Sequence, residues 1–299
     1  MLRLPASRGA LAALALLSLI WSYNWVVMKQ ALAWTGPFEF AAWRAGLGTL
    51  MLFGLLRWRG HAFAPPRWKP LLLVALAQTL GFQALVQWAL VDGGAGRTAL
   101  LAYTMPFWVV LLAWWLLRDR PSRWQWASLA LAFAGLLFLL EPWKGLGGSW
   151  STVLAIAGGF CWAVGTVLSK RMFQRGEAGV LQLTAWQMAV GTVGLVLVAL
   201  AVDEKPMQWT GGLVMALAYN GVLASGLAWL LWSWLVDRLP AQVAGVSSLV
   251  IPILGVLFAW LVLHEAPTGA EWAGIALLVA ALAAVGRRGP RGGQVTNVT

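Results

Sequence analysis

The chain has 299 residues, of which 61% are hydrophobic and 10% are charged, and its formal net charge at pH 7 is +11. A soluble chain of this length needs far more charged side chains to cover its surface, so a water-soluble globular domain is excluded. Apolar runs of about 20 residues recur along the chain, and each is long enough to cross a hydrocarbon core of roughly 30 Å. The composition therefore predicts an all-α polytopic membrane protein.

The apolar runs and the polar segments between them predict ten transmembrane helices joined by short loops. The first run continues without a small-residue cleavage site, so we expect a retained first helix rather than a signal peptide. The short loops predict one bundle without a separate soluble domain. We expect the spans at residues 10–31, 37–56, 71–91, 98–117, 124–140, 151–169, 180–202, 212–235, 240–263 and 271–285.

The basic residues predict the direction of the helices in the membrane. About sixteen Lys and Arg residues fall on the side of the N-terminus, while the other side holds four, Lys29, Arg97, Lys144 and Lys205. Cytoplasmic loops carry the excess of Lys and Arg, so this distribution predicts a bacterial inner-membrane protein with both termini in the cytoplasm. The net charge is thereby explained by helix orientation, and a nucleic-acid partner is not expected.

The second half of the sequence repeats the first at an offset of 141 to 146 residues. Each unit holds five spans, an odd number, so the second copy enters the membrane from the opposite side. We therefore expect a first five-helix repeat at residues 1–145 and a second, inverted repeat with a cytoplasmic tail at residues 146–299. The aligned pairs are Trp21 with Trp162, Lys29 with Lys170, Gly48 with Gly191, Gly81 with Gly226, Asp92 with Asp237, and Pro106, Trp114, Asp119, Pro121 and Trp126 with Pro252, Trp260, Glu265, Pro267 and Trp272.

One face of the first span and the matching face of the sixth carry large aromatic and small polar side chains. Trp21, Asn24 and Trp25 lie at helical spacing on one face of the first span. Trp162 and Thr166 lie on the matching face of the sixth. Polar side chains inside a bilayer are costly unless they face the bundle interior, so these faces predict a binding pocket near the midplane. The alternative is that these Trp side chains only pack the bundle or lie in the interfacial belts.

Amides and hydroxyls in three other spans are further candidates. Gln83 and Gln87 lie on one stripe of the third span, where they can bind a polar solute or hydrogen-bond neighbouring helices. Tyr103 and Ser248 each lie just before the proline of their span. Proline removes a backbone donor and frees carbonyl groups, so these positions predict kinks beside a cavity, or else fixed bends.

Arg44 is the one basic residue well inside a predicted span. Its guanidinium group can hold a substrate carboxylate, or its side chain can extend to the outer headgroups. The repeat places Gln187 at the matching position, with Trp186 beside it as the match of Trp43. Trp186 and Gln187 complete the set of candidate binding residues.

The residues that metal, cofactor and acid–base chemistry require are missing from the spans. The single cysteine, Cys161, lies in an apolar run, and the two histidines, His61 and His264, lie in different loops. All ten Asp and Glu residues fall at span ends or in loops. We therefore expect no metal site, no cofactor, no enzymatic activity and no buried carboxylate that carries a proton.

Two motifs carry a family resemblance that extends over about residues 10 to 286. They are the proline-containing helices that end in Arg118-Asp119-Arg120-Pro121 and in His264-Glu265-Ala266-Pro267. With the Trp21 and Trp162 segments, they make the chain resemble the ten-helix EamA-type exporters of the drug/metabolite transporter superfamily. The resemblance implies a central cavity lined by spans 1–4 and 6–9. It also implies efflux of amino acids, their derivatives or similar metabolites.

The pattern and the resemblance together predict a secondary transporter that exports amino acids or similar small amphipathic metabolites by alternating access. Its partners would be a small-molecule substrate and the lipid bilayer. One alternative is an integral-membrane enzyme acting on a lipid-linked substrate, which would need acidic or His residues clustered at one interface. The other is a proton-coupled drug exporter. Small drug/proton antiporters of the superfamily depend on a buried Glu in their first helix, where this chain has Asn24.

The predicted topology is testable with fusion reporters. A reporter fused after Arg288 should give a cytoplasmic signal, and reporters inserted near Lys144 or Lys205 should give periplasmic signals, because the basic loops stay in the cytoplasm. Enzymatic reporters that are active in only one compartment measure this directly. A periplasmic C-terminus would overturn both the span count and the inverted repeat.

Overall fold

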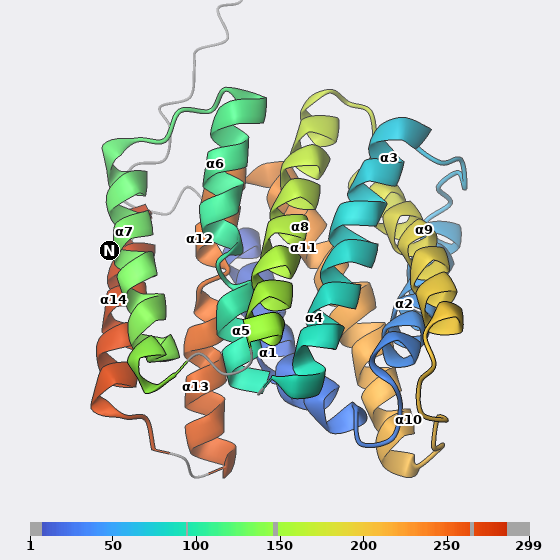
Figure 1. Ribbon diagram of the computed structural model, residues 1–299. Helices are drawn as coiled ribbons and strands as arrows, with labels where there is room; N and C mark the ends of the chain where they lie inside the picture. The colour runs from blue at the N-terminus through green and yellow to red at the C-terminus, as the bar shows by residue number, and fades with distance from the viewer. Residues whose placement is uncertain (1–7, 94, 146–148, 264–265, 286–299) are drawn as a thin grey trace, which may run out of the picture.

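The computed structural model describes residues 8–93, 95–145, 149–263 and 266–285 (Figure 1). Over these ranges the regular structure is entirely helical, which confirms the predicted all-α membrane fold. The elements in chain order are α1 Arg8–Ala31, α2 Pro37–Trp58, α3 Trp68–Val74, η1 Ala75–Gly81, α4 Phe82–Asp92, α5 Ala95–Ala102, α6 Met105–Leu117, α7 Arg123–Leu140, η2 Pro142–Lys144, α8 Ser149–Gln174, α9 Val180–Ala201, α10 Gly211–Ala218, η3 Tyr219–Leu227, α11 Ala228–Arg238, α12 Ala241–Ser247, α13 Val250–Leu263 and α14 Gly269–Val285.

The helices follow the predicted spans to within a few residues. In the described part of the chain, eight helical segments are long and apolar enough to cross a membrane. Two further helices complete the ten spans: α2, which contains the charged residues Glu39 and Arg44, and α14, which has 17 residues. Two spans break just before their prolines, as the sequence predicts. Helix α5 ends at Ala102, before Pro106, and α12 ends at Ser247, before Pro252.

Two of the spans contain a π-helical segment at matching positions of the repeat. The span Trp68–Asp92 contains η1, and the span Gly211–Arg238 contains η3. Each segment carries buried polar side chains, which are Gln78 and Thr79 in η1 and Asn220 and Ser225 in η3. A π turn is wider than an α turn and commonly marks a functional site.

Glycines on α2 and α9 let these helices pack closely against the π-helical segments η3 and η1, respectively. A Cβ atom on Gly48 would lie 2.8 Å from Cβ of Ser225, and one on Gly191 would lie 2.2 Å from Cγ2 of Thr79. Thus α2 packs on η3 and α9 packs on η1, and the two glycines are themselves an aligned pair of the repeat. Helices in lipid gain little from apolar burial against one another, so close contact at small residues is a main source of their association.

Helices α7 and α14 lie side by side at one edge of the bundle (Figure 1). The hydroxyl of Ser128 donates to the carbonyl of Ala281 at 2.7 Å. A Cβ on Gly135 would lie 3.0 Å from the carbonyl oxygen of Gly274. The repeat offset of 146 converts the pair Ser128–Ala281 into the pair Gly274–Gly135. The two contacts are therefore related by the same operation that relates the two halves of the sequence.

Two aligned lysines cap the C-terminal ends of equivalent helices. Nζ of Lys29 donates to the carbonyls of Leu90 at 2.6 Å and Gly93 at 2.9 Å, at the end of α4. Nζ of Lys170 donates to the carbonyl of Asp237 at 2.8 Å, near the end of α11. A cation at a helix C-terminus satisfies free carbonyl groups and favours the negative end of the helix dipole.

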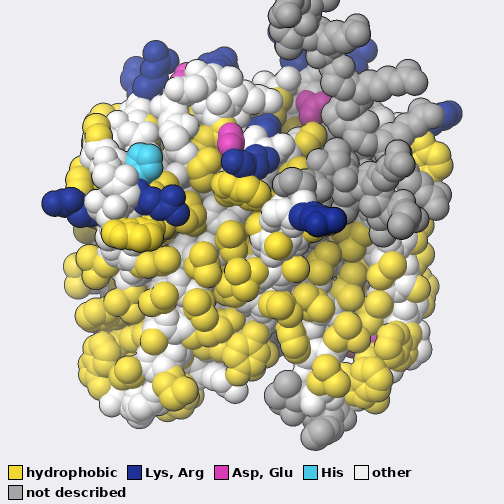
Figure 2. All heavy atoms as spheres, turned by 180° about the vertical axis from the view of Figure 1, so that it is seen from behind, with side chains coloured by type: hydrophobic (Ala, Val, Ile, Leu, Met, Phe, Trp, Pro, Cys, Tyr) yellow, Lys and Arg dark blue, Asp and Glu magenta, His cyan; other side chains and the backbone are white. Residues whose placement is uncertain are grey.

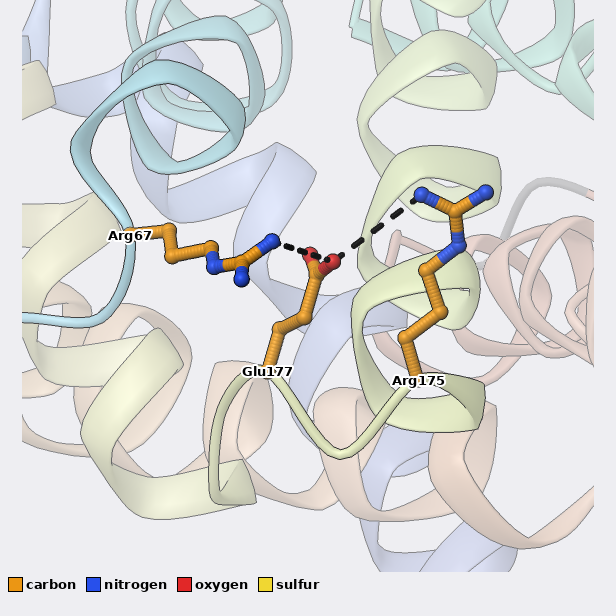
Figure 3. Close-up of polar contacts among 3 residues, drawn as sticks. All are labelled: Arg67, Arg175 and Glu177. Atoms are coloured by element: carbon orange, nitrogen blue, oxygen red, sulfur yellow. Dashed lines mark hydrogen bonds and ion pairs between the residues drawn. The ribbon is translucent and has the colours of Figure 1, made fainter.

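On one face of the molecule, basic side chains lie toward one end of the bundle (Figure 2). On the face drawn in Figure 2 the Lys and Arg side chains lie at the upper end, above a broad apolar band. In Figure 3 the carboxylate of Glu177 lies between Arg67 and Arg175, with N–O distances of 3.4 Å and 3.9 Å. The contact between Arg67 and Glu177 links the loop before α3 to the loop after α8. Exposed ion pairs contribute at most about 1 kcal/mol each.

The close contact at Gly48 is testable against a second glycine of the same helix. Gly48→Ala should lower the stability of the fold by about 1–3 kcal/mol, because the new methyl meets Ser225 and backbone atoms that cannot rotate away. Gly54→Ala meets nothing within 4 Å. It should be neutral or stabilising by up to about 1 kcal/mol. Thermal unfolding in detergent measures both, and equal shifts would contradict the packing described.

Candidate functional site

Six of the residues predicted for binding line one central cavity between the helices. They come from four spans, and all are buried or nearly so. The face of α1 supplies three of them because residues at this spacing point in one direction. The six are Trp21, Asn24, Trp25, Arg44, Tyr103 and Trp162.

The centre of this site is a cluster of aromatic rings around Trp162. The ring of Trp162 lies 5.2 Å from that of Trp21, 5.1 Å from that of Trp229 and 5.5 Å from that of Trp232. Phe82 closes the cluster at 4.7 Å. Such edge and tilted contacts between aromatic rings stabilise the packed arrangement beyond the apolar area that they bury. Trp21 and Trp162 are an aligned pair, so the two repeats meet at these rings.

Some indole N–H groups of the cluster have a hydrogen-bond partner and others do not. Nε1 of Trp21 donates to the carbonyl of Ala224 at 3.1 Å. Nε1 of Trp162 and of Trp232 are buried and lack a hydrogen-bond partner. Buried N–H groups normally find a partner. Of these two residues Trp162 lines the cavity, so its indole can donate to a polar atom that enters.

The cavity is small in this conformation. Its free space is about 40 Å³. This is room for a few water molecules, since one water needs roughly 10–15 Å³ by the same measure. A larger solute can enter only if some of the ring contacts around Trp162 open.

Arg44 reaches the cavity from α2 and is 4% exposed. Its Nη1 donates to Oδ1 of Asn220 at 3.3 Å, and its Nε has no partner. Asn220 lies in η3 and donates from Nδ2 to the carbonyl of Ala216 at 3.1 Å. The amide of Asn220 is thereby held with its oxygen toward the guanidinium group.

Three of the predicted binding residues, Gln83, Gln87 and Thr166, are buried but do not line the cavity. Nε2 of Gln87 donates to the carbonyl of Pro37 at 3.5 Å. Nε2 of Gln78 donates to the hydroxyl of Thr166 at 3.2 Å. The side-chain oxygens of Gln83 and Gln87 have no partner. In this conformation, hydrogen bonds between helices engage Gln87 and Thr166.

The remaining three predicted residues also lie outside the cavity lining. Nε1 of Trp186 donates to the carbonyl of Phe63 at 3.1 Å, in the loop between α2 and α3. Gln187 is buried with its side-chain oxygen unpaired. The hydroxyl of Ser248 donates to the carbonyl of Gly245 at 2.7 Å, within the break between α12 and α13.

The cavity lining also includes six residues outside the predicted set. Met28 lies on the face of α1 that holds Trp21 and Trp25, and the other five are apolar side chains that composition does not distinguish from their apolar neighbours. The repeat offset of 145 aligns Trp232, which packs against Trp162 outside the cavity lining, with Gln87 of the predicted stripe. The six are Met28, Phe82, Val86, Ala102, Met105 and Trp229.

Comparison with known proteins identifies the family. Residues 8–141 and 149–287 each match the EamA-like transporter family. The chain belongs to this family. The predicted resemblance to this family is therefore confirmed, and the protein is a multi-pass membrane transporter.

Transporters from several bacteria are similar to this chain over most of their length. The "Uncharacterized transporter YoaV" of Bacillus subtilis is 26% identical over 83% of this chain and 86% of its own. The "Probable amino-acid metabolite efflux pump" of Salmonella typhimurium is 26% identical over 89% and 91%. The "Riboflavin transporter" of Rhizobium johnstonii is 29% identical over 86% and 82%.

A protein of known crystal structure shares the fold. It superposes with a TM-score of 0.77 at 21% sequence identity and covers 94% of this chain and 97% of its own. The helical arrangement is therefore that of a solved structure.

The packing of Trp162 is testable with a ligand that replaces its ring. Trp162→Ala should lower the stability of the fold by roughly 3–5 kcal/mol, because it leaves an apolar cavity. Added indole should recover part of this loss by filling the cavity. Thermal unfolding in detergent, with and without indole, measures both effects. Trp115→Ala is the control, since this ring is 78% exposed, and a similar response to indole there would contradict the assignment.

Proposed function

We propose that this family member is a secondary transporter that exports amino acids or similar small amphipathic metabolites by alternating access. The observation that carries the proposal is the aromatic cavity where Trp21 meets Trp162, with Arg44 at its wall. Rings supply the apolar contact, and the guanidinium group and the unpaired indole of Trp162 supply polar contacts. The printed name of the Salmonella typhimurium relative, an amino-acid metabolite efflux pump, supports this substrate class.

The repeat suggests how the cavity changes sides. We propose that the halves divide near residue 145, between the two stretches that match the family. Inverted repeats allow alternating access because exchange of their conformations turns an inward-open cavity into an outward-open one. Lys29 and Lys170 hold equivalent helix ends on opposite sides of the bundle. Opening one side would release one of these caps while the other remains formed.

The distribution of charge supports transport without a proton-binding carboxylate in the spans. All ten acidic residues lie at span ends or in loops. A proton carrier needs a group that titrates near neutral pH and is reached from both sides in turn. We therefore propose a carrier in the bacterial inner membrane, with both termini cytoplasmic, that runs on the gradient of its solute. In the described residues, groups of three or more His, Cys, Asp or Glu that could hold a metal are absent.

Transport measurements with cavity variants test the proposal. Proteoliposomes are loaded with a panel of labelled amino acids and amino-acid amides, and the release of each is measured. Trp162→Phe and Trp21→Phe should slow the release of transported solutes by about fivefold, since an aromatic contact contributes roughly 0.5–1.5 kcal/mol. The matched control Trp115→Phe, outside the cavity lining, should leave the rates unchanged. Release of no member of the panel, or equal slowing in all three variants, would contradict the proposed function.

A further inference from the structure

Arg44 brings an uncompensated charge into the interior of the bundle. It lies seven residues from the start of α2, about 10 Å along the helix, and it is 4% exposed. A buried charge is strongly unfavourable unless it is paired with an opposite charge. The described structure gives it one long hydrogen bond to a neutral amide, at 3.3 Å to Asn220, and it leaves Nε unpaired.

The charges around the cavity favour an anion. Among the described residues that line it, Arg44 is the only charged one. Carboxylates fit the guanidinium group because its fork can donate two parallel N–H bonds to their two oxygens. Asn220 occupies Nη1 and leaves Nε available on the other edge of the fork. A cation in the same space would meet a positive charge with no acidic side chain of the described lining to offset it.

The other walls of the cavity define the body of this anion. The rings of Trp21, Trp25, Trp162 and Trp229 face the same space as Arg44. They offer apolar and aromatic surface, and the unpaired Nε1 of Trp162 offers one further donor. An aromatic or aliphatic body with a single carboxylate therefore matches the site better than a small, strongly hydrated anion.

We propose that Arg44 binds the carboxylate of an amphipathic organic monoanion, and that this pairing makes the protein an exchanger. With the anion bound, the guanidinium charge is neutralised and the loaded carrier moves no net buried charge through the low-dielectric interior. The empty carrier must change conformation with its charge unpaired, which is slower because the buried charge is costly. The inference rests on the proposed function, since it takes the central cavity as the transport site.

Four probes that share one phenyl body and differ in charge test the binding site. They are 3-phenylpropanoate, 3-phenylpropanamide, 3-phenylpropylamine and L-phenylalanine. Thermal unfolding of the purified full chain is measured against the concentration of each probe. The propanoate should bind on the order of 10- to 100-fold more tightly than the neutral amide, because a charged hydrogen bond replaces a neutral one. The amine should bind more weakly than the amide.

Substitutions at Arg44 separate binding from structure. Arg44→Gln places here the side chain that the repeat has at Gln187. It should abolish the preference for the propanoate over the amide and leave the amide's affinity unchanged. Arg44→Lys keeps the charge and should keep part of the preference. Arg57→Gln, an exposed arginine of the same helix, should change nothing. If Arg44 is only structural, Arg44→Gln will instead weaken all four probes in parallel, which overturns the inference.

Counterflow in proteoliposomes tests the exchange. Release of labelled 3-phenylpropanoate should accelerate severalfold when the unlabelled compound is added outside, and Arg44→Gln should lose this acceleration. Equal transport of the propanoate, amide and amine would leave the protein a transporter but overturn the anion site. If L-phenylalanine is transported as fast as the propanoate and both rates depend on Arg44, the result supports the carboxylate site but overturns the restriction to monoanions. Failure of all four probes overturns the inference, while the amino-acid panel decides the proposed function separately.

Discussion

The bundle depends on the close contact between glycines of two helices and the wide turns of two others. In a bilayer, apolar burial between helices contributes little, because lipid is as apolar as the side chains. Gly48 and Gly191 let α2 and α9 approach η3 and η1 until side chains touch backbone. The same contact encloses the polar side chains of the wide turns, which would be unfavourable in lipid. It also brings Asn220 to Arg44, so the charge of the cavity is set by the packing of the bundle.

The central cavity combines two groups of side chains with opposite tendencies. The rings around Trp162 pack against one another and nearly fill the cavity, leaving about 40 Å³ of free space. Arg44 is poorly satisfied and gains most from a ligand. Entry of a solute therefore exchanges favourable ring contacts for a favourable charge contact. A solute without a matching charge would lose the first and gain little of the second, which is a physical basis for selectivity in an apolar pocket.

Much of the fold follows from local sequence signals. Apolar runs locate the spans, and prolines locate the breaks before α6 and within the ninth span. Ser122 and Gln125 have the spacing of a capping box, and this capping box forms at the start of α7. The π-helical segments have no such signal, because apolar composition does not distinguish bonding to the fourth residue from bonding to the fifth. The repeat predicts Trp186 as a binding residue and gives no signal for Trp229, but the packing places Trp229 at the cavity and Trp186 against the loop before α3.

The paired π-helical segments give the two spans a way to turn. A π turn contains an extra residue, and it can shift by one residue along a helix while the number of backbone hydrogen bonds stays the same. Each such shift turns one residue by about 100° around the helix axis. Gln78 and Thr79 in η1, and Asn220 and Ser225 in η3, lie where this rotation acts. In both spans, polar side chains that face the bundle interior therefore lie at the point where a one-residue shift of the wide turn would reorient them.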